Sequence, residues 1–215
     1  MPKAAFATSV FVNCPFDNDY VPILQAILFC TVYLGLTPRL ASERADGAEN
    51  RLDKIVELIG ACQYSIHDLS RSQATRAGEF YRLNMPFELG IDYGGRQFGS
   101  ARMTSKRLLI LEERRRNYQS ALSDLSGCDV EVHGGDYAEA MRKVRNWLVN
   151  EAGGRRIGAS RIMSAYVTFQ EWYWETQRAA GSSDADIKQY PTSELLFAMH
   201  QWVTVGEPAS PNQTS

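Results

Sequence analysis

The stretch Lys-Arg-Leu-Leu-Ile-Leu-Glu-Glu, residues 106–113, has an unbroken apolar centre between charged ends. A strand with one face in water alternates apolar and polar residues, so a short continuous apolar run indicates a strand that is covered on both faces. Such strands are typical of parallel sheets with helices packed on either side. This stretch therefore predicts an α/β fold.

Strand-like and helical segments alternate on both sides of this stretch. The predicted strands are residues 9–13, 37–41, 64–70, 106–113 and 129–133. The predicted helices are residues 19–34, 50–63, one that begins at Asn84 after a polar loop at 71–83, then 117–125 and 136–152. Five alternations imply a parallel sheet with right-handed crossovers and helices on both faces. We expect five strands in the order 2-1-3-4-5.

The chain changes character after residue 152. A Gly-Gly-Arg-Arg stretch reads as a linker, and two helical segments, residues 160–179 and 184–203, follow with no strand between them. We therefore predict an α/β domain at 1–152, a helical extension at 153–206 and a disordered tail at 207–215. The aromatic residues of the extension are explained more simply by core or subunit contacts than by a ligand cage.

Composition excludes several classes of protein. The 215 residues carry a formal net charge of -2, which makes nucleic acid an unexpected partner. Four dispersed cysteines and three histidines argue against a zinc site or a disulfide scaffold and suit the cytoplasm. The most apolar run, which starts at Tyr20, is short and interrupted by polar residues, so we expect a buried helix and no membrane partner.

Three polar clusters follow predicted strands or open a helix. They are Asn-Cys-Pro-Phe-Asp at 13–17, His-Asp-Leu-Ser-Arg at 67–71 and Asn-Met-Pro-Phe-Glu-Leu-Gly at 84–90. Ligands of open parallel sheets bind beyond the carboxyl ends of the strands, where the strand order reverses. If the first and third strands are neighbours, the clusters converge on one crevice. No phosphate-binding glycine motif of the P-loop or dinucleotide type is present.

Glu88 is the candidate catalytic residue. Its place about one turn inside a helix predicts an ionised carboxylate, because the helix dipole favours negative charge there. Such a group can stabilise a developing cation or act as a nucleophile, as carboxylates do when a glycosidic bond is cleaved. The alternative is that Glu88 only complements the helix dipole.

Further residues are candidates for binding substrate, each with a structural alternative. Asp68 could bind a ribose or a base, or it could cap the loop. Asp17 and Asn84 could cap helices. Phe16 and Phe87 could enclose a base between their rings, or they could pack in the core. Asp124 faces the crevice or a turn. His67 is a proton shuttle or a buried strand residue, and Cys14 a nucleophile only if a base lies near. The predicted binding set is Asn13, Pro15, Phe16, Asp17, Asp68, Ser70, Asn84, Phe87 and Asp124.

These motifs resemble the superfamily that unites nucleoside 2-deoxyribosyltransferases with bacterial Toll/interleukin-1 receptor (TIR)-like domains. The likeness covers residues 7 to 150 and is carried by Val-Phe-Val-Asn-Cys-Pro-Phe-Asp, His-Asp-Leu-Ser and the pattern N-x-x-F-E-L-G. It implies a flavodoxin-like sheet, and a nucleophile or transition-state stabiliser at Glu88. It also implies a sugar- or base-binding acid at Asp68. Arg82 stands where the deoxyribosyltransferases have an acid, and the first strand lacks the TIR-type Ile-Ser-Tyr.

The resemblance implies a cytoplasmic hydrolase that cleaves the N-glycosidic bond of NAD or a related nucleotide. It further implies an ADP-ribose-type signal in antiviral defence, with a second copy or a defence protein as partner. NAD or the nucleotide is then a substrate, and no cofactor or metal is expected. The alternative is a non-catalytic nucleotide sensor that signals through its C-terminal helices, which the replacement at Arg82 favours. A scaffold that self-assembles through those helices is a third hypothesis.

Overall fold

The computed structural model describes residues 5–71, 82–118 and 122–209, and it contains a five-stranded, all-parallel sheet. The predicted order is confirmed, since the strands lie as β2-β1-β3-β4-β5. Their bounds are β1 Ser9–Asn13, β2 Thr37–Arg39, β3 Tyr64–Asp68, β4 Arg107–Glu112 and β5 Glu131–Val132. Because β1 lies between β2 and β3, the switch in strand order falls beside Asn13 and Asp68.

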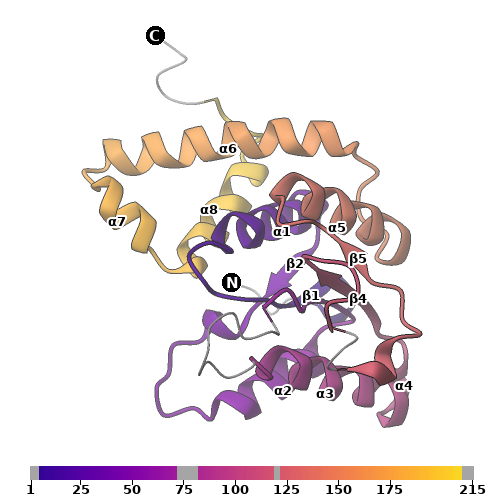
Figure 1. The fold of residues 1–215 in the computed structure, drawn as a ribbon. Coiled ribbons are helices and arrows are strands. Elements are labelled where there is room, and N and C mark those ends of the chain that lie inside the picture. The colour runs from indigo at the N-terminus through magenta and orange to yellow at the C-terminus, as the bar shows by residue number, and fades with distance from the viewer. Residues whose placement is uncertain (1–4, 72–81, 119–121, 210–215) are drawn as a thin grey trace.

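Helices cover both faces of the sheet (Figure 1). Their bounds are α1 Val21–Tyr33, α2 Arg51–Ala61, α3 Asn84–Phe98, α4 Ala101–Thr104, α5 Tyr137–Glu151, α6 Ala159–Ala179, α7 Asp184–Gln189 and α8 Thr192–Thr204. The predicted single helix at 184–203 is wrong, since it is broken into α7 and α8. Pro191 is the physical reason, because the residue before a proline avoids helical geometry and Tyr190 is extended with ψ 141°.

The helix α1 is buried nearly all round, as its apolar run predicts. Pro22 lies in the first turn, where a missing N–H costs nothing. Gly35 follows the helix with φ 87°, a left-handed conformation that favours glycine and ends the helix. Phe29 of α1 packs against Phe169 of α6 and Trp202 of α8, with ring centroids 5.4 and 5.9 Å apart.

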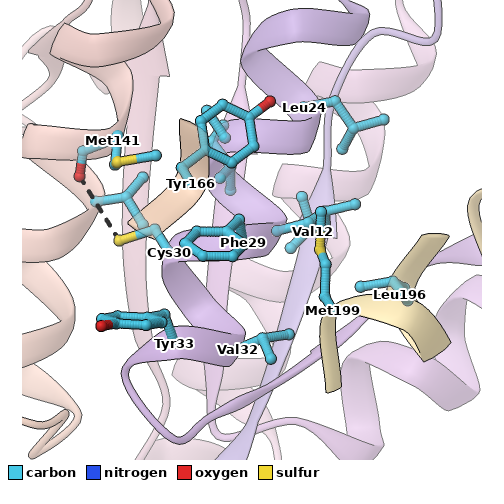
Figure 2. Close-up of a cluster of buried hydrophobic side chains, with 14 of the residues drawn as sticks. Val12, Leu24, Phe29, Cys30, Val32, Tyr33, Met141, Tyr166, Leu196 and Met199 are labelled. Carbon is cyan, nitrogen blue, oxygen red and sulfur yellow. Dashed lines mark hydrogen bonds between the residues drawn. The ribbon is translucent and has the colours of Figure 1, made fainter. Parts of the chain in front are cut away.

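The helical extension shares the core of the α/β domain. One cluster of buried side chains joins Val12 of β1, residues of α1 and α5, and residues of α6 and α8 (Figure 2). Cys30 of α1 donates a hydrogen bond to the Met141 carbonyl of α5 at 3.7 Å. The described residues continue to 209, and Glu207 accepts a hydrogen bond from the Tyr33 hydroxyl at 2.8 Å. Residues 210–215 of the predicted tail lie outside the described residues.

The other face of the sheet carries α2 and α3 over two smaller apolar clusters. The spacing of Leu52, Ile55 and Ile59 in the sequence predicts one buried face of α2; Ile55 and Ile59 are buried, but Leu52 is exposed and Leu58 is buried instead. The predicted α-helix at 117–125 is not found in the described part of that segment, where Ser123–Leu125 form a 3₁₀ turn. Residues 119–121, and 72–81 of the predicted loop, lie outside the described residues.

Across residues 5–71, 82–118 and 122–209, no helix combines the length and the apolar character needed to cross a bilayer.

Candidate active site

The three polar clusters converge at the carboxyl edge of the sheet. Asn13 ends β1 and pairs in register with His67 of β3. The amide nitrogen of Asn13 lies 3.1 Å from Nδ1 of His67 and donates to the Met85 carbonyl of α3 at 3.0 Å. One buried side chain therefore joins the cluster after β1, the cluster in β3 and the start of the helix that carries Glu88.

His67 and Asp68 leave β3 toward opposite faces of the sheet, as successive strand residues must. His67 meets Asp92 of α3, whereas Asp68 meets Tyr20 at the start of α1. The α3 face thus receives the histidine, and the predicted sugar ligand Asp68 lies on the other face.

His67 belongs to a buried chain of polar groups that fixes α3. Its Nε2 lies 3.1 Å from Oδ2 of Asp92, and Oδ1 of Asp92 lies 3.3 Å from Nζ of Lys106. Lys106 also donates to the Ile59 and Cys62 carbonyls at the end of α2, at 2.7 and 2.5 Å. Burial alone raises the pKa of Asp92, but His67 and Lys106 outweigh it and lower that pKa. This series of buried polar contacts anchors α3 at Asp92, one turn beyond Glu88. His67 therefore has a structural role here.

Asp68 is fully buried and accepts hydrogen bonds from both sides. Its Oδ2 accepts from the Tyr20 hydroxyl at 2.5 Å and lies 3.0 Å from Nε2 of His133. Its Oδ1 accepts from the Ser70 N–H at 2.9 Å and from the Ser70 hydroxyl. Burial raises the pKa of Asp68, but the hydrogen bonds from His133, Ser70 and Tyr20 lower it overall. Asp68 thus connects the start of α1 and the end of β5 to β3. Its two carboxylate oxygens already accept from four donors, so they have no free position for a ribose hydroxyl.

The Ser70, His133 and Asp68 side chains do not form a nucleophilic triad. The Gly135 N–H donates to Nδ1 of His133 at 3.1 Å, so the neutral ring carries its proton on Nε2. That same Nε2 lies 3.0 Å from the Ser70 oxygen and therefore cannot accept the serine proton. Ser70 instead donates to Asp68 and completes the buried network.

Glu88 differs from these groups because its carboxylate has no hydrogen-bond partner among residues 5–71, 82–118 and 122–209. The side chain is only 5% exposed and is the fifth residue of α3, beyond the free N–H groups of the first turn. The predicted preference for the ionised form is wrong. Burial raises the pKa of Glu88 to about 7, against a smaller opposing effect of Arg51 at the start of α2.

Cys14 lies within electrostatic range of both acids. Burial, followed by the charges of Asp68 and Glu88, raises the pKa of its thiol well above the usual value. A thiol held in its protonated form is inert as a nucleophile.

The remaining predicted residues lie around this edge in varied settings. Pro15 is buried, and Asp17 forms an ion pair with Arg82 in front of α3. Asn84 is exposed and is the first helical residue, so its predicted role as cap is wrong. Leu83 occupies the cap position with helical backbone angles and makes no side-chain cap.

The two phenylalanines are exposed rather than packed in the core. Phe16 is 49% and Phe87 57% exposed, which leaves both rings available to a ligand or a partner. Asp124 is exposed in the 3₁₀ turn before β5, with no hydrogen bond to Asn13, Asp68 or Glu88.

Two cavities, of about 310 and 400 Å³, lie elsewhere, between α1 and the C-terminal helices. Phe16 lines the smaller one, but Asn13, Asp68 and Glu88 line neither. In the described part of the chain no group of three potential metal ligands occurs.

Four residues of the buried networks around His67 and Asp68 were not predicted from the sequence: Tyr20, Asp92, Lys106 and His133. Asp92 carried a signal, since it follows Glu88 by four residues and so shares its helix face. The others come from distant segments, and only the fold brings them together.

A comparison with protein-family models and with curated proteins finds no match for this chain. The fold and the site geometry are therefore the only support for a function.

Proposed function

We propose that the chain is an N-glycosidase of the nucleotide or nucleoside class, in which Glu88 acts on the anomeric carbon of the sugar. The observation that carries the proposal is a buried carboxyl with a raised pKa, unpaired within the described residues, at the topological switch of a parallel sheet. Strongly perturbed titratable groups in such positions are typical of active sites. By contrast, Asp68 and Asp92 are held by hydrogen bonds and serve the structure.

The chemistry requires the ionised carboxylate. As the C–N bond breaks, its electron pair leaves with the base and positive charge develops on the sugar carbon. Glu88 then stabilises that cation or bonds to it, and water supplies the hydroxyl group of the product. A cationic ring such as the nicotinamide of NAD would favour ionisation of Glu88 when it binds, because an opposite charge lowers a carboxyl pKa. NAD is thus the first substrate to test.

The test is turnover of NAD, deoxynucleosides and nucleotides, followed by chromatography of the released base. Glu88→Gln should lower the rate by at least about a hundredfold, while Glu151→Gln, at an exposed position at the end of α5 outside both cavities, should not change it. The kcat/KM of the wild type should rise with pH through about 7, since only the ionised form acts. Turnover that survives Glu88→Gln would assign the reaction to another residue.

A non-catalytic nucleotide sensor is the second candidate. It is favoured by the engagement of Asp68 in four hydrogen bonds, which leaves Glu88 without a second acid at hand. Calorimetry distinguishes the two, because a sensor binds the intact nucleotide tightly and forms no product. Both candidate functions are compatible with a role in antiviral defence, in which the chain would bind a partner protein or a second copy of itself.

A further inference from the structure

Figure 1 shows α6, α7 and α8 on the side of the sheet that α1 covers. A cleft lies between the start of α1 and these C-terminal helices. It consists of the two cavities of about 310 and 400 Å³, which share the lining residues Gln25, Gln170 and Trp174. Small-molecule sites usually have volumes of about 300–1,000 Å³, so each cavity is large enough to hold a small ring compound.

The walls of this cleft are rich in aromatic rings. Trp174 belongs to both cavities, Tyr173 and Tyr190 line the smaller one, and Tyr137 and Tyr166 line the larger. Aromatic walls favour a flat ligand, because offset stacking adds to the burial of apolar area. The charged lining residues are one cation, Lys188, and one anion, Glu171, so the lining has no excess of charge that would attract a phosphate.

Two amide side chains supply the polar contacts. Nε2 of Gln170 donates to Oε1 of Gln25 at 3.1 Å and to the Tyr166 hydroxyl at 2.7 Å, which fixes the orientation of both amides. Within the described residues, Nε2 of Gln25 and Oε1 of Gln170 then make no hydrogen bond. Gln25 thus offers an unused donor and Gln170 an unused acceptor in the cleft that both residues line, and the edge of a nucleobase carries acceptors and donors that complement such groups.

We propose that the cleft formed by α1 and the C-terminal helices binds an uncharged nitrogen heterocycle of the nucleobase class. The ring would lie between the aromatic walls, with its edge toward Gln25 and Gln170. This site is separate from Glu88 and does not depend on the proposed reaction. Phe16 connects the two places, since it lines the cleft and belongs to the loop between Asn13 and α1.

The test is calorimetric titration of the full chain with adenine, thymine and nicotinamide, and with indole as a flat ring of similar size without the full hydrogen-bonding edge. At least one of the three bases should bind, and about tenfold more tightly than indole. Gln170→Leu and Trp174→Leu should each weaken binding by about tenfold or more. Gln177→Leu, on the same helix but outside both cavities, should leave binding unchanged, and Glu88→Gln should leave it unchanged as well.

Circular dichroism and melting curves of the variants establish that each one is folded. The proposal is overturned if none of the bases binds, or if indole binds as tightly as they do. It is also overturned if Gln170→Leu and Trp174→Leu both bind normally while Glu88→Gln does not, because the ligand would then occupy the Glu88 site. Loss of turnover in Glu88→Gln with base binding retained would separate the two proposals.

Discussion

Asp68 and Glu88 are both buried acids at the same edge of the sheet, yet their surroundings are opposite. Asp68 accepts from Tyr20 and Ser70 and lies within 3.0 Å of His133, and its pKa is lowered. Glu88 has no such partner within the described residues, and burial raises its pKa to about 7. The comparison teaches that depth alone does not define a reactive group, because hydrogen bonds decide whether a buried acid is stabilised as an anion. Asp68 stabilises the fold, whereas Glu88 costs stability.

The largest expected effect is that of Asp68→Asn, which should destabilise the protein by about 3–5 kcal/mol. The new amide would present N–H groups to donors that now point at a carboxylate, which leaves buried groups unpaired. Denaturant unfolding measures the change, with exposed Asp129→Asn as the control. A loss no larger than that of the control would mean that the network around Asp68 contributes nothing.

Tyr20→Phe tests how much one of the four hydrogen-bond donors to Asp68 contributes to the stability of the protein. Removal of this buried hydroxyl, which donates to Asp68 at 2.5 Å, should cost about 1.5–3 kcal/mol, as expected for a hydrogen bond to a charged group. The loss should disappear in strong acid. Because the pKa of Asp68 is lowered in the fold, the stability it confers is present above pH 3.8 and is lost as the pH falls through the folded pKa.

The matched control is Tyr137→Phe, at a residue that is 41% exposed and whose hydroxyl makes no hydrogen bond to a described residue. It should change the free energy of unfolding by less than about 0.5 kcal/mol. Equal effects of the two substitutions would contradict the assigned role of Tyr20.

The smallest expected effect has the opposite sign. Glu88→Gln should stabilise the protein at pH 8 by roughly 1–3 kcal/mol and change little at pH 4.5. The pKa of Glu88 is raised from 4.5 to about 7, so the native state binds the extra proton and the wild type loses stability as the pH rises between these values. Glutamine cannot ionise and escapes that loss.

Thermal and denaturant unfolding at both pH values measure the change in stability caused by Glu88→Gln. Glu171→Gln, at an exposed carboxylate, should show no such gain. A Glu88→Gln variant that is less stable at pH 8 would indicate that the carboxylate has a structural partner and would weaken its assignment as the reactive group.

Much of the fold could be predicted because its signals are local. The apolar run at 106–113 indicates a doubly covered strand, the alternation of strands and helices implies a parallel sheet, and Gly35 ends α1 as expected. Predictions failed where a single residue broke a pattern. Pro191 splits the last helix, and Leu52 is exposed although it shares the helical spacing of the buried Ile55 and Ile59.

The site could be predicted only in outline. The convergence of Asn13, His67 and the start of α3 follows from strand order, since carboxyl ends of parallel strands share an edge. The roles of the acids did not follow, because Tyr20 and His133 reach Asp68 from 48 and 65 residues away. No local pattern contains that information.

The sequence alone established the fold class and placed Glu88 near the start of a helix. Hydrophobic periodicity and turn residues act over a few positions, so they can be read from the chain directly. Only the tertiary structure decided which carboxylate is satisfied, which is desolvated, and that the C-terminal helices border a cleft with α1. Those properties depend on burial and on partners distant in sequence, and packing alone brings such groups into contact.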